Sequence, residues 1–355
     1  MQVAKSLHEF QTLRKLLGNN GKVVSFVPTM GNLHSGHLQL MKIAKQNSDV
    51  VVSSVFVNPA QFAANEDFDK YPRTLQSDLE KMKEIGVDLV LAPGGTSELY
   101  PHGYMTRVFM SKISTDTAQS HPLRNSSGSV GEELNHNWLE DQPEAICRSG
   151  FFDGVSTILV KLFNIVRPQV IVFGQKDAVQ CMVVKRLVKD LNYIDIEKVI
   201  IGETERELDG LAMSSRNQYL SPIDRKYIAP ILNRILFDAQ SSFKNIENVN
   251  AESLRKWLQD SYNQLEFSFE EKLKNHYSNG YNKEDYKIDY LSVCNWNNGH
   301  VYGTISTNNI YTEPFYSIEK ENLQDLTQLC LSTTVRVGGT RLLDNLIINV
   351  RENGI

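Results

Sequence analysis

Two histidines and two glycines lie in residues 28–37 (PTMGNLHSGH), which directly follow an apolar run. His34 and His37 are three residues apart, so both imidazoles can face one site if a helix begins here. Glycines at a strand-to-helix turn let the backbone approach a ligand closely, and the first N–H groups of a helix attract phosphate. The pair could also ligate a metal, but no third ligand stands at the spacing of a zinc helix. The segment therefore predicts a phosphate-binding turn, with purely structural histidines as the plainer interpretation.

Two other segments combine polar side chains that suit phosphate. Residues 174–180 (GQKDAVQ) contain Lys176, and residues 209–217 (DGLAMSSRN) contain two serines followed by Arg216. A compact cation, a planar guanidinium and hydroxyl groups can together neutralise and bind phosphate oxygens. Taken alone, the two serines also fit a helix-capping turn, and Arg216 also fits an ordinary surface charge.

The elements that must position these segments follow a strand–helix alternation. Strands are predicted at residues 23–27, 50–57, 87–91, 170–173 and 198–201, and helices at 7–17, 38–47, 74–85, 155–166 and 178–191. Continuous apolar strands separated by helices are typical of a parallel sheet covered on both faces. We therefore expect an α/β fold with a Rossmann-like parallel sheet. Ligands of such sheets bind beyond the carboxyl ends of the strands, where residues 28–37 and 174–180 lie.

The alternation stops near residue 203, which predicts two domains. The first, residues 1–203, would hold the parallel sheet, and the second, residues 204–355, would be a smaller α+β lid domain. In the second domain we expect helices at 227–243 and 251–265, a strand at 287–293 and a mixed end at 342–350. Residues 113–147 are rich in Ser, Asn and acidic residues without periodicity, so they are predicted to form a mobile surface insertion.

Composition excludes several classes of protein. The 355 residues are 41% hydrophobic and 22% charged, an ordinary globular composition. The net charge of −5 argues against a broad nucleic-acid surface but is compatible with a local basic patch. No apolar run is long enough to span a membrane, and the N-terminus lacks a secretory apolar core. The four cysteines form no Cys-x-x-Cys pair, which fits a reducing compartment. We expect a cytoplasmic protein without membrane or nucleic-acid partners.

The residues of the first segment resemble a known signature motif. His34-Ser35-Gly36-His37 after a strand resembles the His-x-Gly-His signature of the nucleotidyl-transferring α/β superfamily, which includes class I aminoacyl-tRNA synthetases. In that superfamily the histidines meet the triphosphate, and the glycine lets the adenine ring lie against the backbone. Residues 209–217 resemble its second nucleotide-binding loop.

Within this superfamily the chain resembles the pantothenate synthetase (pantoate–β-alanine ligase) family. The matching segments occur in family order across most of the chain, at residues 28–37, 56–62, 71–73, 154–166, 173–177, 209–217 and 339–345. The sequence departs from the family at Phe151, where histidine is usual, at Gln175, where glutamate is usual, and at Glu205, which is often valine and touches adenine through its backbone. Residues 113–147 also form a longer stretch than bacterial members carry.

The resemblance implies ATP-dependent condensation of (R)-pantoate with β-alanine through a pantoyl-adenylate, with release of pyrophosphate and AMP. The pantoate carboxylate is ionised at neutral pH, so its attack on phosphorus needs no general base. The step needs neutralised phosphate charge and aligned reactants. Mg²⁺ is expected to bridge the phosphates, with its protein ligands unknown, and the resemblance implies a homodimer.

The resemblance also implies roles for individual residues. Catalytic roles fall to His34, His37, Lys176 and Arg216, with His37 as the proton donor. The implied ATP-binding residues are Met30, Gly31, Asn32, Leu33, His34, Ser35, Gly36, His37, Gly174, Gln175, Lys176, Asp177, Glu205, Met213, Ser214, Ser215 and Arg216. The implied pantoate-binding residues are Met30, Asn58, Gln61 and Gln180, and Gln61 also borders the β-alanine site. Without the neighbouring motifs, Asn58 would be assigned to a plain turn and Gln180 to an exposed helix position.

Two alternatives stay open at this point. Another adenylyl-transferring enzyme would share the histidine segment and Ser214-Ser215-Arg216. It should lack the amino-acid sequences found here at residues 56–62 and 174–180. A catalytically silent nucleotide-binding scaffold would use residues 113–147 as a partner surface.

Overall fold

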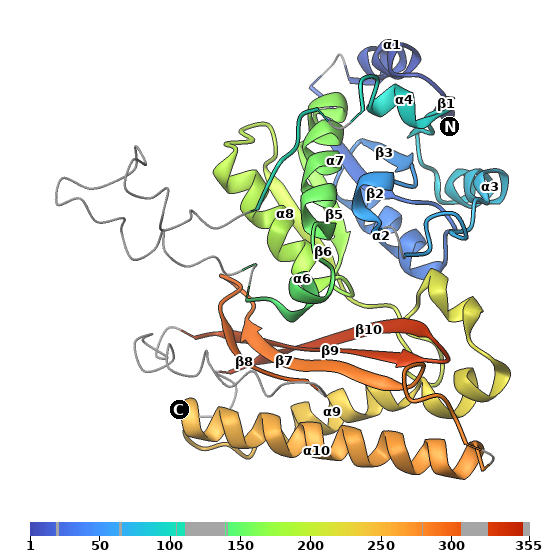
Figure 1. Ribbon diagram of the computed structural model, residues 1–355. Coiled ribbons are helices and arrows are strands. Elements are labelled where there is room, and N and C mark those ends of the chain that lie inside the picture. Colours follow the sequence, from blue (N-terminus) through green and yellow to red (C-terminus); the bar gives the residue numbers. More distant parts are fainter. Residues whose placement is uncertain are drawn as a thin grey trace.

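The protein consists of two layered units, seen one above the other in Figure 1. The computed structural model describes residues 1–18, 21–63, 66–103, 105–110, 139, 141–278, 280–306 and 326–350. Within these residues no helix is sufficiently long and apolar to cross a membrane.

The first unit is a six-stranded sheet in which every neighbouring pair of strands is parallel. Its strands are β1 (Gln2–Ala4), β2 (Val24–Thr29), β3 (Val50–Val55), β4 (Leu89–Leu91), β5 (Val170–Gly174) and β6 (Lys198–Gly202), in the order β1-β4-β3-β2-β5-β6. From β2 the chain proceeds to β3 and β4 on one side, whereas β5 and β6 extend the other side. The order therefore reverses between β2 and β5, and such a reversal opens a crevice at the carboxyl ends of the two strands.

Helices cover both faces of this sheet. The helices of this unit are α1 (Leu7–Gly18), α2 (Ser35–Gln46), α3 (Leu75–Ile85), α4 (Thr96–Leu99), α6 (Pro143–Cys147), α7 (Phe151–Val166) and α8 (Ala178–Asp190). Successive strand residues point to opposite faces. Phe26 accordingly packs in the core formed with α1, α7 and α8, whereas Val27 packs in the core formed with α2 and α3. The predicted parallel sheet with two covered faces is confirmed.

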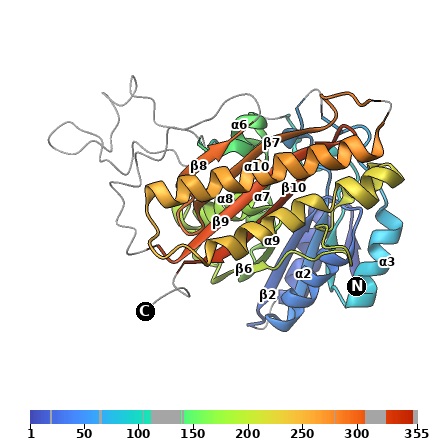
Figure 2. The same cartoon turned by 90° about the horizontal axis from the view of Figure 1, so that it is seen from below.

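The second unit is a four-stranded antiparallel sheet with helices on one face (Figures 1 and 2). Its elements are α9 (Ile231–Phe243), α10 (Ala251–His276), β7 (Lys287–Asn295), β8 (Val301–Ile305), β9 (Gln328–Val337) and β10 (Thr340–Asn349), with strand order β10-β9-β7-β8. The apolar sides of α9 and α10 form one core with this sheet. Cys294, Trp296, Val301 and Cys330 instead join the core of the first unit, so the two units share a packed boundary.

Several predicted elements need correction. Strands β1, β8 and β9 are absent from the elements predicted above. Residues 342–350, predicted as a mixed end, belong almost entirely to β10, and α10 continues past Leu265 to His276. The helix expected from residue 227 begins at Ile231, after a π-helical turn at Asp224–Ile228.

The predicted insertion at residues 113–147 is wrong at its carboxyl end. Residues 113–138 and 140 lie outside the described residues, so the structure does not test most of that prediction. Residues 143–147, however, form α6, and Gln142, Pro143 and Glu144 are buried. The Gln142 side-chain amide donates a hydrogen bond of 2.6 Å to the carbonyl of Gly299, which ties this segment to the second unit.

Candidate functional site

The turn after β2 is held open by a buried carboxylate. Gly31 has a φ of +88°, a conformation that favours glycine, and a Cβ there would lie 3.1 Å from an oxygen of Asp78. Asp78 is fully buried and accepts hydrogen bonds from the backbone N–H groups of Asn32 (2.9 Å) and Leu33 (2.8 Å). The backbone before α2 is thereby fixed, while the side chains of His34 and His37 face the crevice.

The two histidines lie at the start of α2. His34 is the N-cap, and its backbone N–H donates to Nδ1 of His37 at 3.4 Å, with the ring centroids 4.1 Å apart. Burial, and then the neighbouring His37 and Lys176, lower the pKa of His34 to about 3. Burial, opposed by the charge of Asp177 and aided by that of Lys176, lowers the pKa of His37 to about 4. Both imidazoles are therefore neutral at pH 7. Because Nδ1 of His37 accepts a hydrogen bond, Nε2 of the neutral ring carries the hydrogen and can donate to a ligand.

The turn after β5 holds Lys176 beside Asp177, with 3.3 Å between Nζ and a carboxylate oxygen. A residue of the second unit fixes this turn. Asn345 of β10 is fully buried, and its amide nitrogen donates to the carbonyls of Gln175 (3.0 Å) and Lys176 (2.8 Å). Its amide oxygen accepts from the Gln175 side chain at 3.2 Å. The next residue toward the N-terminus, Asp344, pairs with Arg206 at 2.7 Å.

The loop that contains Ser214 and Ser215 reaches back to the first unit. The Ser215 hydroxyl donates to the carbonyl of Asn32 at 3.1 Å, and the Ser214 hydroxyl caps the following 3-10 turn. The Arg216 guanidinium forms two hydrogen bonds, of 3.1 and 2.9 Å, with the carboxylate of Asp67. Burial alone would raise the pKa of Asp67, but hydrogen bonding and attraction to Arg216 outweigh burial and lower it.

An amide cluster forms the opposite wall, on the 3-10 turn Pro59–Gln61. Asn58 donates to Oε1 of Gln61 (3.0 Å) and to the carbonyl of Gly154 (3.1 Å), and it accepts from the Tyr100 hydroxyl (2.9 Å). The Asn58 amide is thus engaged within the protein, and its effect here is to orient Gln61. Gly154 is required for this packing, because a Cβ there would lie 2.2 Å from the carbonyl oxygen of Ala60.

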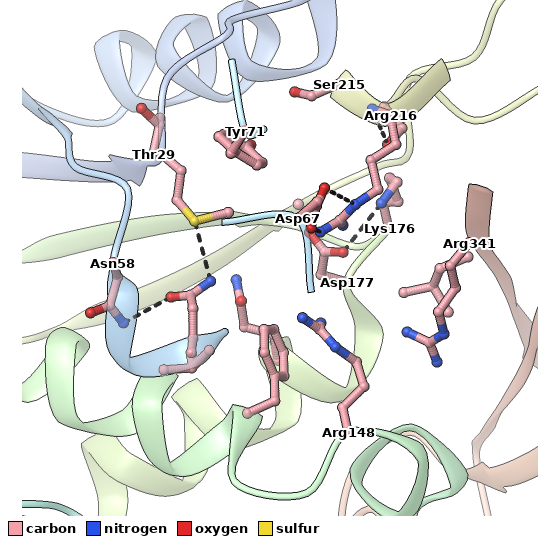
Figure 3. Close-up of a pocket in the computed structure, with 18 of the residues that line it drawn as sticks. Thr29, Asn58, Asp67, Tyr71, Arg148, Lys176, Asp177, Ser215, Arg216 and Arg341 are labelled. Atoms are coloured by element: carbon pink, nitrogen blue, oxygen red, sulfur yellow. Dashed lines mark hydrogen bonds and ion pairs between the residues drawn. The ribbon is translucent and has the colours of Figure 1, made fainter. Parts of the chain in front are cut away.

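These walls enclose a cavity of about 910 Å³ between the two units. Figure 3 shows Lys176, Asp177 and Arg216 grouped on one side, with Asn58 on another and Arg148 reaching up between them. The cavity lies at the carboxyl ends of β2 and β5, where the strand order reverses. Its size and its mixture of apolar wall and converging polar groups are typical of a small-molecule site.

Comparison with known proteins decides the family. Residues 2–347 match the family model described as pantoate-beta-alanine ligase. The chain belongs to the pantoate–β-alanine ligase family. It is 42% identical to the pantothenate synthetase of a Thermoanaerobacter species, with 98% of each chain covered, and 36% identical to that of Acetivibrio thermocellus, with 99% of this chain and 100% of the relative covered.

Solved structures of the same family agree. The pantothenate synthetase of Thermus thermophilus superposes with a TM-score of 0.68 at 31% identity, covering 98% of this chain and 99% of that one. The pantoate-beta-alanine ligase of Francisella tularensis, complexed with beta-gamma ATP and beta-alanine, gives a TM-score of 0.62 at 26% identity, covering 98% and 97%. The six-stranded parallel sheet followed by a smaller antiparallel unit is therefore a ligase-family fold.

The cavity gathers most of the residues that the sequence singled out for this ligase family. Those that line it are Met30, His34, Gly36, His37, Asn58, Gln61, Gly174, Lys176, Asp177, Gln180, Glu205, Met213, Ser214, Ser215 and Arg216. Gly31, Asn32, Leu33, Ser35 and Gln175 do not line it. The Ser35 hydroxyl contacts the sulfur of Met213 instead, and Gln175 contacts Asn345.

Sequence reasoning missed two ion pairs on the cavity wall of this ligase-family member. Asp67 pairs with Arg216, and Glu66 pairs with Arg148 through hydrogen bonds of 2.8 and 3.0 Å. Arg341 also lines the cavity. It lies in the matching segment 339–345, but it was not among the predicted site residues. One signal lay nearby in the chain, because the matching segment 71–73 comes shortly after Glu66 and Asp67. Nothing in the sequence linked Glu66 to Arg148.

The described residues offer no ready-made metal cage. None of their His, Cys, Asp and Glu side chains forms a group of three or more that could hold a metal ion. These side chains therefore do not fit a metal site held by the protein alone.

Proposed function

We propose that this chain condenses (R)-pantoate with β-alanine to form pantothenate, using ATP. The reaction would proceed through a pantoyl-adenylate and release pyrophosphate and AMP. The observation that carries this proposal is the convergence of the two histidines, Lys176 and the Ser-Ser-Arg loop on one cavity, in a chain that belongs to the pantoate–β-alanine ligase family. Family membership does not favour the silent scaffold or another adenylyl-transferring enzyme.

In the first step a pantoate carboxylate oxygen attacks the α-phosphorus, and the bond from that phosphorus to pyrophosphate breaks. Lys176 and Arg216 are proposed to neutralise charge on the phosphate oxygens, and Ser214 and Ser215 to donate hydrogen bonds to them. His37 is proposed to donate through Nε2 to the departing pyrophosphate, with His34 beside it. Neutral imidazoles suit this role because each offers an N–H group without adding a full charge.

In the second step the β-alanine amine attacks the carbonyl carbon of the adenylate, and the carbon–oxygen bond to AMP breaks. We propose that Gln61 and Gln180 bind the pantoate hydroxyls and that Met30 contributes apolar surface for its methyl groups. Asn58 is proposed to act on pantoate through Gln61, which it orients at 3.0 Å. A site built to hydrogen-bond a hydroxyl discriminates strongly against analogues that lack it.

The remaining nucleotide contacts are proposed from the family resemblance. They involve Gly31, Asn32, Leu33, Ser35, Gly36, Gly174, Gln175, Asp177, Glu205 and Met213. We propose that Mg²⁺ accompanies ATP, held by phosphate oxygens and water, where it neutralises phosphate charge.

We also propose a cytoplasmic homodimer. The four cysteines are free thiols, which supports a reducing compartment. The dimer rests on the family resemblance.

Pyrophosphate exchange tests the proposed function. With ATP and Mg²⁺ the purified protein is expected to exchange labelled pyrophosphate into ATP only when pantoate is present, and to release AMP once β-alanine is added. Exchange with another acid but not with pantoate would identify another adenylyl-transferring enzyme. Tight ATP binding without turnover would identify a scaffold.

A further inference from the structure

Arg148 lies on the cavity wall and belongs to none of the nucleotide-binding segments. Its side chain is 10% exposed, and the guanidinium carbon lies 3.4 Å from the centre of the Phe151 ring. Stacking fixes the plane of the guanidinium, and Glu66 occupies one edge of it, at 2.8 Å from Nε and 3.0 Å from Nη2. Within the described residues, Nη1 makes no hydrogen bond or ion pair. One edge is therefore available to a second carboxylate, the group that an arginine fork binds best.

The position of Arg148 links it to the amide wall. Phe151, on which it stacks, is the first residue of α7, and Gly154 in the same turn packs directly against Ala60 and Gln61. Figure 3 shows Arg148 below Asp177 and Lys176, with Arg341 to one side and Asn58 across the cavity. Phe151 and Gly154 thus link Arg148 to the turn that contains Gln61, one of the residues proposed to hold pantoate.

The charge around Arg148 indicates what kind of molecule fits there. The half-buried pair of Arg148 and Glu66 has no net charge. Hydrogen bonding and attraction to Arg148 outweigh burial and lower the pKa of Glu66, so the carboxylate is ionised. A simple anion on Arg148 would meet repulsion from Glu66. A zwitterion adds a carboxylate for Arg148 together with an ammonium group that offsets Glu66, so the site remains neutral.

We propose that Arg148 binds the carboxylate of β-alanine and thereby places its amine against the adenylate carbonyl. This assignment rests on the proposed function, since it concerns the second substrate of that reaction. Lys176 and Arg216 lie on the phosphate side, and Arg336 and Arg341 share Asp289 at 3.3 Å each. Arg148 stacks on Phe151 of α7, the helix whose Gly154 packs against the amide wall.

Separate measurement of the two half-reactions distinguishes a role in β-alanine binding from a role in ATP or pantoate binding. In the Arg148→Gln variant, pantoate-dependent pyrophosphate exchange is expected to stay within about twofold of the native rate, whereas the KM for β-alanine rises about 10- to 100-fold. Arg148→Lys keeps the charge but loses the fork, so an intermediate KM is expected. Loss of exchange in both variants would overturn the assignment, because Arg148 would then act on ATP or pantoate. Absence of exchange in the native protein would instead overturn the proposed function.

A substrate without the carboxylate provides the second arm. Propylamine has an amine on a three-carbon chain but cannot use Arg148. The native protein is expected to prefer β-alanine over propylamine in kcat/KM, and Arg148→Gln is expected to lose most of that preference. An unchanged preference would overturn the proposal. Arg186→Gln is the matched control, because it breaks an exposed ion pair with Asp190 on α8 and should leave both half-reactions unchanged.

Discussion

Arg216 illustrates how one side chain serves two partners. Its guanidinium is proposed to bind phosphate, yet in this structure both of its contacting nitrogens face the carboxylate of Asp67. A triphosphate that enters the cavity must compete with that carboxylate, which also repels phosphate. We therefore expect Asp67 to weaken ATP binding while it holds Arg216 in the cavity wall.

Replacing Asp67 tests this competition. Asp67→Asn removes the charge and retains the shape, so the KM for ATP in the exchange reaction is expected to fall about two- to fivefold, the range of a partly exposed ion pair. Asp69→Asn is the control, since it removes the same charge from an exposed position of the same loop. A large rise in the ATP KM of Asp67→Asn alone would show that Asp67 positions Arg216 rather than competing for it.

At the residue scale, the sequence predicted those functional side chains that belong to a recognisable local motif. The histidines, Lys176 and Ser214-Ser215-Arg216 could be found because each follows an apolar run and has a characteristic spelling. Glu66 and Arg148 could not be found, because they are 82 residues apart and neither lies in such a spelling. Ion pairs between distant segments depend on packing that no local pattern records.

At the scale of elements, one strand of the second sheet supports the nucleotide turns of the first unit. In β10, Asn345 holds the turn of Gln175 and Lys176, and Asp344 holds Arg206. Arg206 also donates to the carbonyl of Gly210, so the loop that leads to the two serines is fixed by the same strand. The position of Lys176 in the cavity therefore depends on β10.

Asn345→Ala tests that dependence. The carbonyls of Gln175 and Lys176 lose a buried donor, so the free energy of unfolding is expected to fall by about 1–3 kcal/mol. The KM for ATP in the exchange reaction should rise as well, because Lys176 is no longer held in place. Asn349→Ala, at the exposed end of the same strand, is the control for both measurements. A loss of stability with an unchanged ATP KM would contradict a positioning role for Asn345.

The strands were predictable where both of their faces are buried. Strands β2, β3 and β5 read as continuous apolar runs because helices cover both of their faces. Strand β9 was missed because Ser332, Thr333 and Thr334 interrupt its apolar run. All three are nevertheless buried, and the Thr333 hydroxyl donates a hydrogen bond of 2.8 Å to the carbonyl of Tyr290. Strand β1 has three residues, too few to show any period.

At the scale of the whole molecule, the cavity exists because two units with separate sheets meet. The parallel sheet supplies the histidines, Lys176 and the amide wall, and the second unit covers them with β10. The division of the chain near residue 203 stays a prediction. The convergence of strand ends was predictable from the alternation of strands and helices, whereas the antiparallel partner was only partly visible in the sequence.

Isotope transfer tests the central claim most directly. Pantoate labelled with ¹⁸O in both carboxylate oxygens is incubated with ATP, Mg²⁺ and β-alanine, and the products are analysed by mass spectrometry. If a carboxylate oxygen attacks the α-phosphorus and then leaves with AMP, each pantothenate formed is accompanied by one AMP that carries one ¹⁸O. We expect that label in AMP and none in pyrophosphate. Unlabelled AMP would contradict an acyl-adenylate, whether the label stayed in pantoate or appeared in a different phosphate product.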